Sequence, residues 1–373
     1  MSFTSKQALS GQLTDPFQNS VPESAGDMER ILDYGRWCPS GDNCQPWHFL
    51  KKDDTHLEIY LDDKEGFYNF RNTPLWLMAG FLIETIRISA SALNYEIVWE
   101  HIASDGPKQI NIRFIKKDVQ KDPLFEFIKL RSVNRGWYEK KALEAQHKAT
   151  LEQSLGDHLR IQWIEDPALC WEMARISALS TDIRLRVKEV FQHHKEILDF
   201  ERSYSPDKIP VSTIACALSA KIMKWSMENW PRTDFMMKFM GGTLLPMVEM
   251  DYLPGLNSGA YFIVNYKNVP GNAEKIPALI DSGRSLQRFW LQLTKEGIGM
   301  QPAYAPLIFS WYVKQNVSFS QSAGLQHKAG IMTKRLEKFS PIENIVFIGR
   351  MGYPRPKLIT ARSVRKPLSE LLS

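Results

Sequence analysis

The amino-acid sequence predicts an α+β fold in which helices flank mixed or antiparallel sheets. The first observation is a pair of segments, 97–102 and 110–115, in which apolar and polar residues alternate as in a β-hairpin. The second is the helical periodicity of two long segments, 75–93 and 278–296. The third is a weak internal repeat that relates these two helices to each other.

The other elements follow in order along the chain. Residues 1–24 are expected to form a loose arm, and a short helix over 28–37 should end where Pro39 disfavours further helix. The turn formers that follow Pro39 predict a loop. A polar helix is expected at 123–130, a mostly helical region at 167–257 and a turn at 297–302. Further strands are expected at 47–51, 57–61, 160–164, 260–266 and 345–348.

The composition is that of a globular protein and limits the possible partners. The 373 residues are 43% hydrophobic and 24% charged, which provides enough apolar mass for a large core. The net charge of +5 is spread too evenly for a nucleic-acid surface, but it suits a small anionic ligand. Four cysteines do not form a disulfide framework, and no Cys or His spacing indicates a metal site.

No membrane or secretion signal is visible in the sequence. The N-terminus lacks the apolar core of a signal peptide. The longest apolar stretch, 74–93, contains Glu84 and Arg87, which can pair on one face of a helix. That pairing favours a core helix over a membrane span. We therefore expect a cytoplasmic protein without a membrane partner.

The repeat is found by aligning 79–97 with 282–300 without gaps. Gly80 then falls on Gly283, and most of the apolar positions coincide. Any two amphipathic helices can align in this way, so chance similarity remains the alternative explanation. A true repeat would divide the chain into two related halves.

Four segments resemble motifs of the FMN-dependent nitroreductase family. Residues 38–47, Cys-Pro-Ser-Gly-Asp-Asn-Cys-Gln-Pro-Trp, resemble the family loop Ala-Pro-Ser-x-x-Asn-x-Gln-Pro-Trp at nine of the ten positions in the pattern. Residues 131–138 resemble its basic motif, Arg-Ser-x-Arg followed by an aromatic residue, with one extra residue in the spacing. Residues 297–302 resemble a Gly-Leu-Gly-x-x-Pro helix end, and 348–354 resemble a closing Ile-Gly-Tyr-Pro segment.

This resemblance implies a nitroreductase-like fold and one non-covalently bound FMN per chain. Ordinary members are homodimers in which each flavin lies between the basic motif of one subunit and the loop of the other. Here the loop comes early and the basic motif late, as if two subunits were fused into a pseudo-dimer with one complete site. The halves would be 25–125 and 126–373, with a helical insert at about 170–257 acting as a lid over the flavin.

The resemblance also assigns roles to residues on both sides of the flavin. Arg131 and Arg350 are candidates for the phosphate, and Arg135 for the phosphate or the N1/O2 edge of the ring. Ser132 can bond ribityl or phosphate oxygens. The remaining candidates contact the ring: Pro39, Ser40, Asn43 and Gln45 from the loop, and Gln301 and Pro302 beside N5 and O4.

Each of these residues also has a purely structural interpretation. Arg131 and Arg350 could be surface charges, and Ser40 and Asn43 could be turn residues. The segment 362–367 repeats the pattern Arg-Ser-x-Arg, but no predicted strand or helix follows it. We interpret it as a basic tail, with a smaller possibility that it returns to a flavin.

The function implied is that of an FMN-dependent oxidoreductase of nitroreductase type. Hydride would pass through flavin N5 in a ping-pong mechanism, with NADH or NADPH as possible reductant, a small-molecule substrate and no protein residue required as acid or base. The chain would act as a monomeric pseudo-dimer or a weak homo-oligomer. One alternative is a protein that sequesters FMN beneath the lid. Another is a flavoenzyme that acts on a peptide or a natural product.

Overall fold

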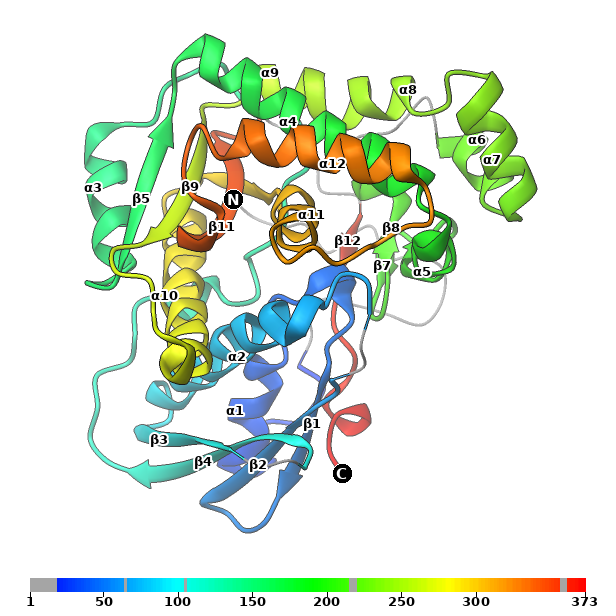
Figure 1. Ribbon diagram of the computed structural model, residues 1–373. Helices are drawn as coiled ribbons and strands as arrows, with labels where there is room; N and C mark the ends of the chain where they lie inside the picture. Colours follow the sequence, from blue (N-terminus) through cyan, green and yellow to red (C-terminus); the bar gives the residue numbers. More distant parts are fainter. Residues whose placement is uncertain (1–18, 64–65, 104–105, 215–219, 356–360) are drawn as a thin grey trace.

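The computed structural model describes residues 19–63, 66–103, 106–214, 220–355 and 361–373 (Figure 1). Most of the arm predicted over 1–24 therefore lies outside the described residues. Its last part is anchored, because the Ser20 hydroxyl donates to Asp33 Oδ1 at 2.5 Å and accepts from the backbone N–H of Leu368 at 3.0 Å. None of the described helices has the length and apolar character needed to cross a membrane.

The first sheet is antiparallel and contains four strands in the order β1-β2-β4-β3. Side chains alternate along β2, where Leu57, Ile59 and Leu61 are buried. The hairpin predicted from alternating residues is confirmed as β3 and β4. The elements of this part of the chain are α1 (Asp27–Gly35), β1 (Trp47–Lys51), β2 (His56–Leu61), α2 (Thr73–Ser91), β3 (Tyr95–Ile102) and β4 (Lys108–Lys116).

The second sheet repeats the arrangement of the first. Its order is β5-β9-β11-β10, again antiparallel throughout. When the strands of each sheet are numbered along the chain, the spatial order in both sheets is first, second, fourth, third. In both, a long helix lies in sequence between the second and third strands, and a shorter helix precedes the first strand. The elements are α3 (Ala145–Ser154), β5 (Leu159–Ile164), β9 (Ala260–Tyr266), α10 (Lys275–Lys295), β10 (Gly299–Pro302) and β11 (Ile345–Gly352).

Two insertions distinguish the second sheet region from the first. Helices α11 (Ala305–Lys314) and α12 (Ala323–Leu336) lie between β10 and β11, and they pack with α4 (Pro167–Arg186) around a second apolar core (Figure 1). Asp166 caps the N-terminus of helix α4, and its side chain accepts from N–H groups of the first turn. The larger insertion runs from α4 to β9 and is mostly helical, as predicted. Its other elements are α5 (Phe191–Ile197), β6 (Leu198–Asp199), β7 (Tyr204–Ser205), β8 (Ile209–Pro210), α6 (Ala220–Ser226), α7 (Trp230–Phe239), α8 (Leu244–Met247), the π-helix η6 (Val248–Tyr252) and α9 (Leu253–Leu256).

Helices α2 and α10 cross between the two sheets, and the crossing depends on two glycines (Figure 1). A Cβ atom added at Gly80 would overlap the carbonyl oxygen of Ile280 and lie 2.8 Å from the Cα of Gly283. A Cβ atom added at Gly283 would overlap the carbonyl oxygen of Leu77. The contact is therefore reciprocal, because each glycine meets the backbone three residues before the other. These are the two glycines that the sequence alignment superposes.

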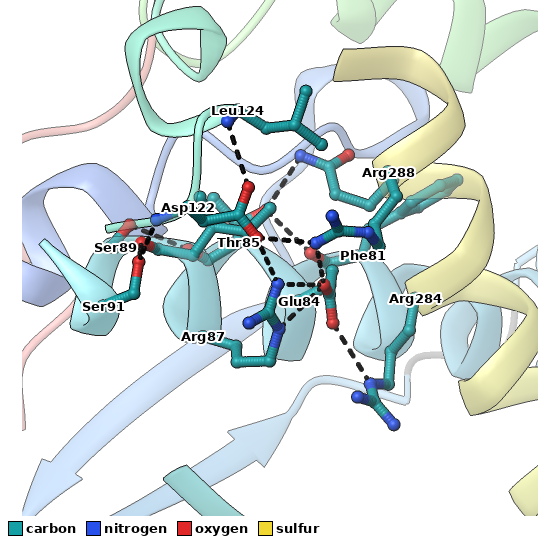
Figure 2. A network of polar contacts seen from close by, with 12 residues as sticks. Phe81, Glu84, Thr85, Arg87, Ser89, Ser91, Asp122, Leu124, Arg284 and Arg288 are labelled. Atoms are coloured by element: carbon teal, nitrogen blue, oxygen red, sulfur yellow. Dashed lines mark hydrogen bonds and ion pairs between the residues drawn. The ribbon is translucent and has the colours of Figure 1, made fainter. Parts of the chain in front are cut away.

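A polar network beside the crossing extends the same reciprocity. Glu84 on α2 pairs with Arg288 on α10 at 3.1 Å, while Gln287 donates to the Thr85 hydroxyl at 2.9 Å. The alignment of Gly80 with Gly283 also places Glu84 on Gln287 and Thr85 on Arg288. The two contacts are therefore equivalent under the repeat, although one is ionic and the other is neutral. Figure 2 shows that Arg87 also reaches Glu84, at 2.8 Å. The pairing of Glu84 with Arg87 predicted from sequence is confirmed.

The C-terminal segment is part of the fold. Strand β12 (Arg362–Ser363) pairs in parallel with β7 of the insertion. The chain then follows β1, where the N–H of Phe49 donates to the Leu371 carbonyl at 2.7 Å and the N–H of Ser373 donates to the Phe49 carbonyl at 2.8 Å. The interpretation of 362–367 as a basic tail is wrong.

Three further expectations require correction. The helix predicted at 123–130 contains only the 3-10 turn Phe125–Phe127. The turn predicted at 297–302 is confined to its start, where Gly297 has φ +68°, because the following residues pair with β11 as strand β10. Strand β11 continues through Gly352 beyond the predicted end at 348 because β9 and β10 pair with it on both sides.

Candidate functional site

The loop after α1 has an unusual backbone. Asp42, Asn43 and Gln45 have φ values of 51°, 62° and 49°, in the left-handed region that non-glycine residues seldom occupy. Such conformations persist only where surrounding contacts fix them, and they occur often at functional sites. Pro39 before them is buried, and the Ser40 hydroxyl accepts from the Gln45 N–H at 3.1 Å. The other contacts that fix this loop come mostly from distant parts of the chain.

The amide side chains of Asn43 and Gln45 supply most of these contacts. Asn43 Nδ2 donates to the carbonyls of Val364, at 3.1 Å, and of Ser205 and Lys208, both at 3.3 Å. Gln45 Nε2 donates to the Pro206 carbonyl at 2.7 Å, and its Oε1 accepts from the N–H of Lys366 at 3.0 Å. Both side chains therefore hold the C-terminal segment and the insertion against the loop. Their hydrogen-bonding groups are used within the protein.

Arg131, Arg362 and Arg365 are buried beside this loop, with 2%, 5% and 9% of their surface exposed. Arg36 is also buried there, but it pairs with Asp33 at 2.8 Å. Arg365 donates from Nη1 to Asn43 Oδ1 at 2.7 Å, and Arg362 donates to the Arg131 carbonyl at 2.5 Å. Arg131 lies over the ring of Trp290, with Cζ 4.7 Å from its centre. Arg131 Nε is buried and has no hydrogen-bond partner.

The electrostatics of this arginine cluster favour an anion. Burial, followed by the charges of Arg365 and Arg362, lowers the pKa of Arg131 well below its ordinary value. Burial also lowers the pKa of Arg362 to about 9 and that of Arg365 to about 10. Within the described ranges, neither Arg131 nor Arg365 forms an ion pair with a carboxylate. Buried charges of one sign without counter-charge are costly, and a bound anion would relieve that cost.

Arg350 has a different environment from this cluster. Its guanidinium donates to Gln301 Oε1 at 2.8 Å and to the carbonyls of Arg135, Gly136 and Pro254, at 2.9, 3.0 and 3.2 Å. Arg350 therefore ties strand β11 to β10, to the basic motif and to the end of the insertion. The structure does not bring it into the arginine cluster around Arg131.

Arg135 and the remaining predicted residues lie around the loop and strand β10. Burial lowers the pKa of the half-buried Arg135, while the nearby charge of Asp42 raises it. The Ser132 hydroxyl is partly buried and points toward the Val133 carbonyl at 3.4 Å. Pro302 ends β10 and is partly buried. Arg135 therefore lies near Asp42 of the loop, while its backbone carbonyl accepts from Arg350.

The insertion also reaches the loop through a histidine. His193 Nε2 lies 3.0 Å from Asp42 Oδ2, and the neighbouring His194 Nε2 lies 2.8 Å from the Tyr68 hydroxyl. Burial, the largest single effect, raises the pKa of Asp42, but the hydrogen bond from His193 and the charges of His193, His194 and Arg135 together outweigh it, and the pKa is below its ordinary value. Reasoning from sequence assigned neither histidine to the site, and it interpreted Arg362 and Arg365 as part of a basic tail. The pattern Arg-Ser-x-Arg at 362–365 was the signal that could have identified the arginines.

Comparison with known proteins gives only distant similarities. No family model matches the sequence, and no curated protein matches it at a significant level. Among solved structures, a nitroreductase-like family protein from Bacillus cereus is 14% identical, with a TM-score of 0.33 over 67% of this chain and 94% of that one. A nitroreductase family protein from Clostridium novyi NT is 12% identical, with a TM-score of 0.31 over 67% of this chain and 92% of that one. An FMN-dependent nitroreductase from Mycobacterium smegmatis, in complex with NADPH, is 14% identical, with a TM-score of 0.33 over 66% of this chain and 94% of that one. Similarity at this level does not place the chain in a family.

Proposed function

We propose that this chain is an FMN-dependent oxidoreductase of the nitroreductase type, built as a single-chain pseudo-dimer with one flavin. The observation that carries the proposal is the buried arginine cluster beside the loop at 39–45. A phosphate dianion supplies the counter-charge that Arg131 and Arg365 lack, and guanidinium groups bond phosphate oxygens in pairs. The unpartnered Arg131 Nε offers a further donor. The residues present therefore fit the phosphate end of FMN.

The other predicted ligands divide into two groups in this proposal. Ser40, Ser132 and Arg135 remain candidates for direct contact with the ribityl chain or the ring, and Pro39, Gln301 and Pro302 for packing along the ring. Asn43, Gln45 and Arg350 act as positioning residues, since their side chains hold backbone segments in place. FMN, when bound, supplies hydride transfer between a reductant such as NADH or NADPH and a small-molecule substrate.

The pseudo-dimer is supported by the shared strand order of the two sheets and by the reciprocal contact of Gly80 with Gly283. A single site is supported by the difference between the two sides of the crossing. Met78 contacts the loop at 39–45, and its aligned counterpart is Asp281. Asp281 lines a groove of about 580 Å³ whose other charged groups pair with one another, namely Glu84, Arg87, Asp122, Arg284 and Arg288. That groove lacks the uncompensated arginines of the proposed flavin site.

Titration with FMN tests the proposal. We expect the purified chain to saturate at one FMN per chain, because the loop motif occurs once in the sequence and the described residues contain one such arginine cluster. The measurement is the quenching of flavin fluorescence, with protein concentration fixed by absorbance. Riboflavin, which lacks the phosphate, should bind much more weakly. Saturation at two flavins per chain would contradict the single-site proposal, and absence of binding would contradict FMN dependence.

A second candidate function, sequestration of FMN, is favoured by the contacts of the insertion. Segment 204–210 of the insertion is bonded to Asn43 and Gln45, and His193 of the insertion contacts Asp42. The insertion is therefore attached to three residues of the loop. The FMN-loaded chain should distinguish the two functions when it is mixed with NADPH and, separately, with dithionite. Reduction by both reagents within seconds supports the oxidoreductase. Reduction by the smaller dithionite alone supports sequestration.

A further inference from the structure

A small, partly open cavity lies between the insertion and the end of β10. Its volume is about 100 Å³, which is room for a small chemical group and too little for a flavin ring system. Helix α4 contributes Thr181 and Arg184, the π-helix η6 contributes Asp251, and strands β9 and β11 contribute Tyr261 and Arg350. π-Helical turns are rare and occur often at functional sites. The residues of this cavity on α4 and η6 have no role in the sites described above.

Two polar atoms in this cavity are buried without partners. Arg184 Nε and Asp251 Oδ2 each lack a hydrogen-bond partner, although both side chains line the same cavity. Among the described residues these two side chains form no ion pair with each other, so a cation and a carboxyl group line the same cavity without bonding to each other. Buried polar atoms almost always have partners. A molecule between the two groups would satisfy both.

The charge of the cavity indicates what this molecule should be. Burial raises the pKa of Asp251 to about 6, against the lowering effects of Arg184, a hydrogen bond from Thr181 and Arg350. The other titratable groups that line the cavity, Tyr261 and Tyr304, have pKa values raised by burial and remain neutral. Near pH 6 and below, the cavity holds two guanidinium groups and a carboxylic acid that can donate a hydrogen bond. This combination of donors suits oxygen acceptors that carry negative charge.

We propose that this cavity binds a planar two-oxygen group, a carboxylate or a nitro group, between the guanidinium of Arg184 and the carboxylic acid of Asp251. One oxygen accepts from Arg184, and the other accepts from Asp251. Gln301 and Pro302, expected beside the flavin ring, line the same cavity. The cavity therefore holds the oxygen-bearing end of the substrate, a role that rests on the proposed oxidoreductase function. Binding of the group does not depend on that function.

The experiment uses two small probes of the same shape, acetate and nitromethane, with the full-length chain. Binding is followed by NMR chemical-shift changes, with and without saturating FMN. Acetate should bind at least about tenfold more tightly at about pH 5.5 than at about pH 7.5, because ionised Asp251 repels the anion above its pKa. Nitromethane is uncharged and should show a weaker pH dependence.

Variants identify the two groups. Arg184→Met should weaken acetate binding roughly tenfold or more, since a charge-assisted hydrogen bond is lost. Asp251→Asn keeps a donor but does not titrate, so acetate binding should become similar at the two pH values. Arg186→Met, which removes a partly exposed arginine paired with Asp182 on the same helix, is the matched control and should leave binding unchanged.

The outcomes separate this proposal from the proposed function. Acetate affinity that is unchanged in Arg184→Met, or equal at both pH values in the unmodified chain, would mean that the cavity holds only water, and the proposal is overturned. If acetate behaves as expected but the chain binds no FMN, the cavity stands and the oxidoreductase does not. Normal FMN binding by Arg184→Met excludes a general loss of structure as the cause of weaker acetate binding.

Discussion

Replacement of Arg365 by methionine is expected to weaken FMN binding at least about thirtyfold. The Arg365 guanidinium is buried, carries no carboxylate partner and lies with Arg131 beside the loop at 39–45. Removing one member of a buried, charge-assisted pair typically costs about 2–5 kcal/mol, and about 1.4 kcal/mol corresponds to a tenfold change in affinity. Arg131→Met should have an effect of similar size. Fluorescence titration with FMN measures both.

Two controls separate a loss of phosphate contact from damage to the loop. Riboflavin has no phosphate, so its affinity should be nearly the same in both variants and in the unmodified chain. Arg113→Met removes an exposed arginine from strand β4 and should leave FMN binding unchanged. If Arg365→Met and Arg131→Met both bind FMN as Arg113→Met does, the phosphate lies elsewhere. A parallel loss of riboflavin binding would indicate that the loop itself has been disturbed.

The second large effect concerns stability. Gly80→Ala should lower the free energy of unfolding by about 3 kcal/mol or more, because the added Cβ overlaps the Ile280 carbonyl and the two helix backbones must separate. Urea unfolding followed by circular dichroism measures the change. Gly330→Ala on α12 is the matched control, because its Cβ meets no atom within 4 Å. It should stabilise the chain by up to about 1 kcal/mol through helix propensity. Equal stability of the two variants would contradict the close helix crossing.

Local patterns predicted much of the fold. Strands β1 and β9 occupy the predicted residues, because alternating or continuous apolar runs between turn residues identify a strand without knowledge of its partner. The alignment that places Gly80 on Gly283 reflects a physical requirement, since only glycine permits the approach of α2 to α10. Strand β12 has two residues and exists only because β7 pairs with it, so no local pattern could reveal it.

The candidate site was predicted less completely, for a related reason. Sequence identifies residues that can donate or accept hydrogen bonds, but not whether another part of the chain already uses them. Asn43 matches a motif position and Arg350 lies within a segment that resembles a motif, yet the folded chain bonds their side chains to Val364 and to the basic motif. Arg365 was considered part of a tail, because its burial depends on the pairing of the last residues with β1.

The two equivalent contacts beside the helix crossing affect which amino-acid substitutions the two sides of the molecule can accept. When two identical chains associate, every residue at their interface is present twice, so a charge that improves one side is imposed on the other. Here the ionic contact of Glu84 with Arg288 and the neutral contact of Thr85 with Gln287 occupy exchangeable positions within one chain. Each side is specified by its own residues. Substitutions can therefore remodel the groove at Glu84 while the arginine cluster keeps its chemistry, a freedom that a symmetric pair of chains does not have.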